Sequence, residues 1–153
     1  PKAIDTSFFK VPWGDALVHV YAKPGADINA TMYELKKDTS FDTFLPDQTP
    51  AYWHYRKSDD RYNRIGDILL VPKLPGIFNF SSRKPTPGKH GFDNNLPDMR
   101  ATFIAWGPAF KQGTKISGFE NVNVYPLVAH ILGLQIDEKQ IDGRLKVLAP
   151  ILK

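Results

Sequence analysis

The chain has 153 residues, of which 42% are hydrophobic and 24% are charged, and its formal net charge is +4. This length and composition suit one ordinary globular domain and exclude a largely disordered chain. Cysteine is absent, which excludes disulfides, thiolate metal sites and a cysteine nucleophile. The lysines and arginines are scattered rather than gathered between aromatic residues, so we expect no nucleic-acid partner.

No apolar run approaches the roughly 20 residues that are needed to cross a bilayer, so we expect no membrane segment. The chain begins at Pro1, without a methionine and without the features of a signal peptide. We therefore expect a processed product or a piece of a longer protein. The lack of cysteine does not decide the compartment, and the location of the chain itself stays open.

The first part of the sequence predicts a small unit of strand, helix and strand. Residues 16–22 are rich in strand-forming side chains and end at a turn of lysine, proline and glycine. Asp27 or Asn29 can cap a helix that runs to Lys37. Residues 41–45 then alternate apolar and polar side chains, as an extended strand does. Apolar side chains recur on one face of the helix at spacings of four and three: Ile28, Met32 and Leu35.

Four further segments carry a structural prediction. Residues 52–55, YWHY, are an aromatic group that we interpret as packing rather than as a binding platform. The apolar run 68–71 fits a strand that is covered on both faces, as in a largely parallel sheet. Residues 99–108 predict another buried strand. Residues 124–133 predict a closing helix, with apolar side chains at spacings of three and four and a final glycine as C-cap.

The stretch that most resembles a chemical site is residues 88–95, GKHGFDNN. It places His90 between Gly88 and Gly91 and ahead of an acidic residue. Glycines allow the backbone to adopt conformations barred to other residues and to approach a ligand closely. This segment therefore predicts a loop that presents a histidine.

The other histidines have simpler explanations, since His19 falls in a strand, His54 in the aromatic group and His130 on the closing helix. His90 alone cannot form a metal site, because zinc takes about four ligands. No HxH or HExxH pair, nucleophile elbow or phosphate-binding glycine loop supplies the rest. From the residues alone the sequence offers one candidate ligand without a site around it.

Three blocks of sequence resemble a known family. GKHGFDN at 88–94, MRATFIAWGPAF at 99–110 and FENVNVYPLVAHILGL at 119–134 are similar, in order and spacing, to the C-terminal part of the type I phosphodiesterase/nucleotide pyrophosphatase family. Shorter similar stretches lie upstream, and DGRL at 142–145 closes the likeness. The resemblance thus extends over nearly the whole chain.

The resemblance implies an α/β fold that is the C-terminal portion of an alkaline-phosphatase-like core, with a small strand-helix-strand unit near the N-terminus. Residues 1–153 would form a single C-terminal segment of a larger catalytic domain. Within this segment, roughly residues 16–60 would be a small α/β insertion. Residues 61–153 would supply core strands, the metal-ligand loop and the closing helix.

The resemblance also implies a reaction. Enzymes of this family hydrolyse phosphodiester or pyrophosphate bonds with two metal ions, usually zinc, and a threonine nucleophile. The histidine of the Gly-x-His-Gly motif binds one of these metals, and this role carries over to His90. The nucleophile and the other ligands have no counterpart here, so we assign no catalytic residue and expect the chain alone to be inactive. Asp93 would either brace His90 or only stabilise the loop, and the sequence leaves both open.

For the parent protein the resemblance implies a nucleotide or another phosphodiester as substrate, and a periplasmic, secreted or cell-surface location. A sheet that lacks its neighbouring strands exposes edges, so the segment could self-associate. Three alternatives stay open: a phosphonate or phosphomonoester hydrolase of the same superfamily, a non-catalytic binding module, and a structural interaction protein.

Overall fold

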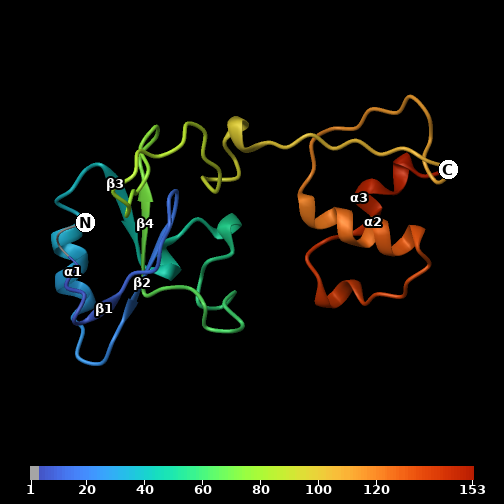
Figure 1. Ribbon diagram of the computed structural model, residues 1–153. Helices are drawn as coiled ribbons and strands as arrows, with labels where there is room; N and C mark the ends of the chain where they lie inside the picture. The colour runs from blue at the N-terminus through green and yellow to red at the C-terminus, as the bar shows by residue number, and fades with distance from the viewer. Residues whose placement is uncertain (1–3) are drawn as a thin grey trace. The chain divides into compact units, whose positions relative to one another are not determined.

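Figure 1 shows a computed structural model of the chain, which describes residues 4–153. The chain divides into two units, of which unit 1 ends at Ala101 and unit 2 spans Thr102–Lys153. Each unit has its own cluster of buried apolar side chains. No helix in this part of the chain has the length and apolar character needed to span a membrane.

Unit 1 is built on a four-stranded antiparallel sheet with the order β1-β2-β4-β3 and one covering helix, α1. Strand β4 lies between β2 and β3, and both neighbours run antiparallel to it. The elements are β1 (Phe9–Lys10), β2 (Val18–Ala22), α1 (Ile28–Leu35), β3 (Phe41–Phe44) and β4 (Ile68–Pro72). The predicted unit of strand, helix and strand is therefore confirmed as β2, α1 and β3.

Helix α1 covers one face of this sheet. It begins at Asp27, whose side-chain Oδ1 accepts a hydrogen bond from the Ala30 N–H at 2.9 Å, so Asp27 and not Asn29 is the N-cap. Its buried residues Met32 and Leu35 join a core with alternate residues of the strands. The core also contains Val18, Val20, Ile68, Leu70, Phe9 and Phe41, among others.

An aromatic layer covers the opposite face. His19, Leu69 and Phe44 are cross-strand neighbours, so their side chains share this face. Trp53, from the 3₁₀ turn Ala51–Trp53, packs edge-on against Phe44 with ring centroids 5.7 Å apart. Tyr55 lies 5.8 Å from His19 by the same measure. Leu69 is fully buried beneath this layer, which agrees with interpreting residues 52–55 as packing.

Two strand predictions need correction. The run 68–71 does form a strand covered on both faces, but the sheet is antiparallel, and the covering comes from α1 on one side and the aromatic layer on the other. Residues 99–108 form no strand. An extended segment becomes a strand only when another pairs with it, and among residues 4–153 no strand pairs with this one. Its Ile104 and Trp106 are 73% and 82% exposed.

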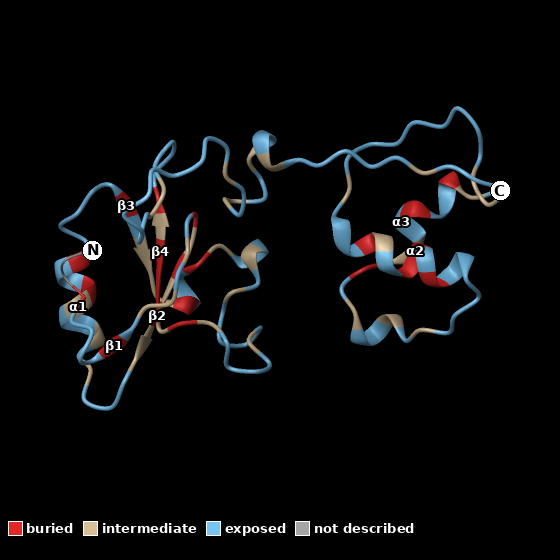
Figure 2. Cartoon of the chain, viewed as in Figure 1, coloured by how far each residue is buried: buried red, intermediate tan, exposed pale blue. Residues whose placement is uncertain are grey.

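The α-helices of unit 2 are α2 (Val124–Ile131) and α3 (Leu145–Leu148), and short 3₁₀ turns and irregular segments flank them. Leu127 of α2 packs with Leu148 and Ile151 in a small core. Figure 2 shows the contrast along α2 between buried and exposed positions. The predicted helix is confirmed, and Gly133 follows it with a φ of +68°, as a C-terminal glycine does.

The start of α2 is tied to the second half of unit 2 through a buried polar side chain. Asn123 Oδ1 accepts a hydrogen bond from the Arg144 N–H at 2.8 Å, and Asn123 Nδ2 donates to the Glu120 carbonyl at 3.0 Å. Gly143 lies so close to residue 122 that an added Cβ would fall 2.1 Å from the Val122 carbonyl oxygen. The Asp-Gly-Arg sequence therefore serves close backbone packing at this position.

Candidate functional site

The loop of residues 88–95, which we call the His90 loop, lies in unit 1 and has no helix or strand of its own. Gly88 and Gly91 have φ values of +79° and +88°, a region that other residues rarely adopt. The side chain of His90 between them is exposed. The structure thus agrees with the expectation that the glycines shape a loop presenting this histidine.

Two polar contacts tie the His90 loop to the rest of unit 1. On one side of the histidine, Lys89 Nζ forms a salt bridge of 2.7 Å with Asp15 Oδ2. On the other side, Asp93 Oδ2 accepts hydrogen bonds from the Tyr52 hydroxyl at 2.6 Å and from Trp53 Nε1 at 3.2 Å. The loop is therefore attached both to the segment before β2 and to the aromatic layer.

The environment of Asp93 keeps its carboxyl group ionised. Partial burial by itself would raise the pKa of Asp93, but the hydrogen bonds from Tyr52, the Asn95 backbone and Trp53 outweigh it and lower the pKa below the ordinary value. Its Oδ1 accepts from the Asn95 N–H at 2.8 Å. Within residues 4–153 these bonds run to the loop and the aromatic layer and none joins Asp93 to His90, which favours the loop-stabilising role.

His19 is a structural histidine. Its Nδ1 accepts a hydrogen bond from the Gly66 N–H at 3.1 Å, and its ring lies against Tyr21 and Tyr55. Burial lowers the pKa of His19, and the negative charge of Asp60 opposes this in part. The ring is thus held neutral in a packed position, as the sequence suggested.

His54 and His130 are carried by other elements than the His90 loop. His54 follows the turn Ala51–Trp53 with a φ of +55°, and its side chain is exposed. His130 lies in the last turn of α2, in unit 2. Among residues 4–153, no metal-binding group of three or more side chains includes either of them with His90.

The residues present do not by themselves form a metal site. Among residues 4–153 no group of three or more His, Cys, Asp or Glu side chains has a geometry that could hold a metal ion. Zinc takes about four ligands, and His90 would supply one.

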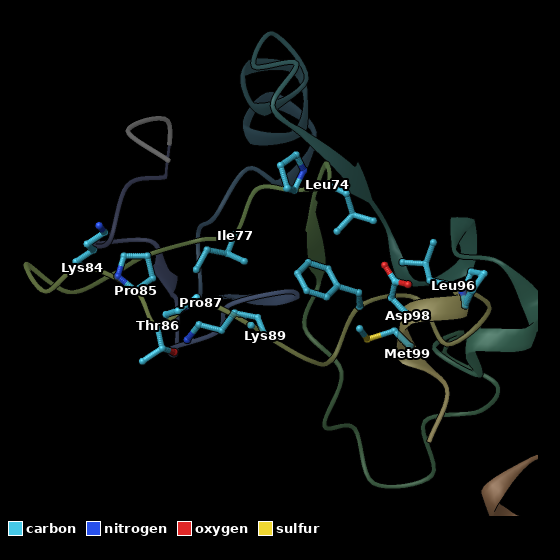
Figure 3. A pocket seen from close by; sticks show the side chains of 14 residues that line it. Leu74, Ile77, Lys84, Pro85, Thr86, Pro87, Lys89, Leu96, Asp98 and Met99 are labelled. Atoms are coloured by element: carbon cyan, nitrogen blue, oxygen red, sulfur yellow. The ribbon is translucent and has the colours of Figure 1, made fainter. Parts of the chain in front are cut away.

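Two hollows meet at the His90 loop. The larger, of about 1100 Å³, has mainly apolar walls with Lys84, Lys89 and Asp98 among its lining residues (Figure 3). The smaller, of about 290 Å³, is lined by rings of the aromatic layer together with Asp93. Phe92 of the His90 loop lines both hollows.

Sequence reasoning missed the partners that hold the loop. Tyr52, Trp53 and Asp15 are 41, 40 and 74 residues away from the loop residues that they bind. Spacing carries no signal at such distances. The sequence pattern indicates only packing for the aromatic group, although a buried tyrosine hydroxyl or tryptophan N–H usually has a hydrogen-bond partner.

No family model matches the sequence. Individual relatives do. Bis(5'-adenosyl)-triphosphatase ENPP4 of Bos taurus is 38% identical over 98 residues, which cover 64% of this chain and 21% of the relative. Ectonucleotide pyrophosphatase/phosphodiesterase family member 7 of Rattus norvegicus is 44% identical over 130 residues, 80% of this chain and 27% of the relative. Family member 1 of Mus musculus is 40% identical over 97 residues, 61% of this chain and 10% of the relative.

Solved structures match over nearly the entire chain. Human ectonucleotide pyrophosphatase/phosphodiesterase 5 superposes with a TM-score of 0.84 at 22% identity, covering 99% of this chain and 39% of the other. The murine protein gives a TM-score of 0.80 at 21% identity with the same coverage. The fold is therefore a part of the alkaline-phosphatase-like α/β fold.

The curated relatives, rather than the fold alone, support the similarity to a family. The resemblance of the three sequence blocks is confirmed, because the chain is similar to part of several members of the nucleotide pyrophosphatase/phosphodiesterase family. It spans between 10% and 27% of the length of the relatives named above.

Proposed function

We propose that this chain is part of a metal-dependent phosphodiesterase or nucleotide pyrophosphatase, which hydrolyses phosphodiester or pyrophosphate bonds through a threonine nucleophile outside this chain. The names of the relatives support this class of reaction, since they describe pyrophosphatases, phosphodiesterases and a triphosphatase. They favour it over a phosphonate or phosphomonoester hydrolase. The substrate would be a nucleotide or another phosphodiester, and the parent would act in the periplasm, at the cell surface or after secretion.

The observation that carries the proposal is the presentation of His90. Its side chain is exposed on a loop whose two glycines adopt left-handed backbone conformations, and contacts on both sides attach that loop to unit 1. In the proposed enzyme, His90 binds one of two zinc ions, and the other ligands come from the remainder of the catalytic domain. The chain would act as one segment of that domain, and the boundary expected near residue 60 stays a prediction.

The chain alone is proposed to be inactive, because it offers one of the roughly four ligands that each zinc needs. Exposed apolar side chains such as Val128 on α2 and Leu132 at its C-cap would allow self-association of the isolated segment. Neither a nucleic-acid partner nor a membrane segment is part of the proposal.

Calorimetric titration of the purified chain with zinc tests the role of His90. We expect weak binding, which His90→Ala removes and the matched change of an exposed turn histidine, His54→Asn, leaves in place. Asparagine suits position 54 because it tolerates a positive φ. Tight binding of two zinc ions by this chain, or weak binding that survives His90→Ala, would contradict the proposed role.

A further inference from the structure

We propose that Asp93 is the positioning residue of the His90 loop: by binding the side chains of Tyr52 and Trp53, it fixes the backbone that presents His90. This inference rests on the proposed function, because holding His90 in place matters only if His90 binds a metal ion. It rests on the geometry of unit 1 for its evidence.

Asp93 binds at both of its oxygens. Oδ2 receives the Tyr52 hydroxyl at 2.6 Å and Trp53 Nε1 at 3.2 Å, while Oδ1 receives the Asn95 N–H at 2.8 Å. The hydrogen bond from the Asn95 N–H closes a local turn within the loop. The bonds to the two rings attach that shaped loop to another part of the chain. Because the acceptor is a carboxylate, each bond is stronger than one between neutral groups.

The two donor residues, Tyr52 and Trp53, belong to the aromatic layer that packs on the sheet. The Trp53 ring packs edge-on against Phe44 of β3 and against Tyr55, with centroid distances of 5.7 and 6.4 Å. Phe44 is the cross-strand neighbour of Leu69 in the central strand β4. Asp93 therefore connects a loop without secondary structure to the sheet through a single layer of rings.

Such a connection matters because of the two glycines beside His90. Gly88 and Gly91 have conformational freedom that would let an unanchored histidine sample many positions. A binding side chain has to be held to within about 0.5 Å of its working position. Asp93 is three residues beyond His90, close enough to limit this freedom.

The second attachment, between Lys89 and Asp15, is expected to contribute less. Its side chains are 26% and 49% exposed, and exposed ion pairs contribute little to stability. The proposal thus separates the two contacts: removing the Asp93 carboxylate should loosen residue 90 more than removing the Lys89 charge.

The absence of native cysteines allows a direct measurement of position. Nitroxide labels at His90→Cys and at Asp42→Cys, an exposed site on β3, report the spread of distances between the loop and the sheet by pulsed electron resonance. We expect one narrow distance peak in the labelled chain. Asp93→Ala should replace it with a broad distribution, and Tyr52→Phe should broaden it partly.

Matched variants make the outcome specific. Tyr33→Phe removes a hydroxyl from an exposed tyrosine on α1 and should leave the peak narrow. Lys89→Gln should broaden it less than Asp93→Ala. In Asp93→Ala, adding Tyr52→Phe should broaden it no further, because the two residues act through one bond. If Asp93→Ala does not fold, as judged by circular dichroism, the nearly isosteric Tyr52→Phe still tests whether the bond to Asp93 narrows the distance distribution.

An unchanged narrow peak in folded Asp93→Ala, or in Tyr52→Phe, would overturn the proposal, as would greater broadening by Lys89→Gln. The measurement uses neither metal nor substrate. A failure of the proposed function in the zinc titration would therefore leave this result unaffected, and the two failures can be told apart.

Discussion

The Tyr52 hydroxyl lies 2.6 Å from Asp93 Oδ2, which joins the aromatic layer to the His90 loop across 41 residues of sequence. Tyr52 follows β3 in the chain, and Asp93 follows His90. The bond connects the loop that carries a candidate metal ligand to a tyrosine ring that packs against Trp53.

Loss of this bond should lower the stability of unit 1. Tyr52→Phe removes the hydroxyl and leaves an ionised carboxylate with one donor fewer, which should reduce the free energy of unfolding by about 1 kcal/mol. Urea unfolding followed by circular dichroism measures the change. Tyr33→Phe is the matched control, since its ring is 68% exposed on α1. Equal effects of the two substitutions would contradict the account.

Unit 1 should lose stability as the pH falls through the range in which His19 titrates. Burial lowers the pKa of His19 below its ordinary value near 6.5, so the folded state favours the neutral ring that accepts the Gly66 N–H. The stabilisation is then complete above about pH 6.5 and is lost as the pH drops toward the lowered pKa.

His19→Gln keeps a hydrogen-bond acceptor that does not titrate, so the slope of stability against pH should become shallower between about pH 7 and 5. Urea midpoints of both proteins across this range measure the difference. Identical slopes would show that His19 does not contribute to the pH dependence.

Gly143→Ala should destabilise unit 2 strongly, because a Cβ there would lie 2.1 Å from the Val122 carbonyl oxygen, a contact that backbone atoms must move to relieve. Gly118→Ala, also in unit 2, meets no atom within 4 Å and should have little effect. Thermal unfolding of the two variants compares them. Similar melting temperatures would contradict the close packing at residue 143.

Leu127→Ala should reduce the free energy of unfolding of unit 2 by about 2–5 kcal/mol, since the side chain is 2% exposed and packs in the small core. The neighbouring Val128→Ala, at a position 45% exposed, should change it by less than about 0.5 kcal/mol. Amide hydrogen exchange of α2 measures both. Comparable losses of protection would mean that the two faces of α2 are not distinguished by burial.

Local patterns predicted much of the fold. The helix that begins at Asp27, the strands on either side of it, and the helix that ends before Gly133 all depend on side chains a few residues apart. Such short-range signals are present in the sequence whatever surrounds them. The sequence also singled out the glycines beside His90, whose backbone angles require that residue type.

These local patterns do not predict which distant segments of the chain pair or contact one another. The apolar run 68–71 predicts burial on both faces but says nothing of strand direction, and β4 runs antiparallel to both neighbours. Residues 99–108 have the composition of a strand, yet strand formation depends on a partner. The contact between Asp93 and Tyr52 joins distant segments for the same reason, and only three-dimensional structure reveals it.

The most direct test of the proposed role is an assay of the purified chain with p-nitrophenyl thymidine monophosphate and zinc. The account predicts no hydrolysis above the buffer rate, because the proposed function gives this chain a single metal ligand, His90, and places the nucleophile outside the chain. Hydrolysis that is abolished both by EDTA and by His90→Ala would contradict it, since the chain would then contain a complete active site.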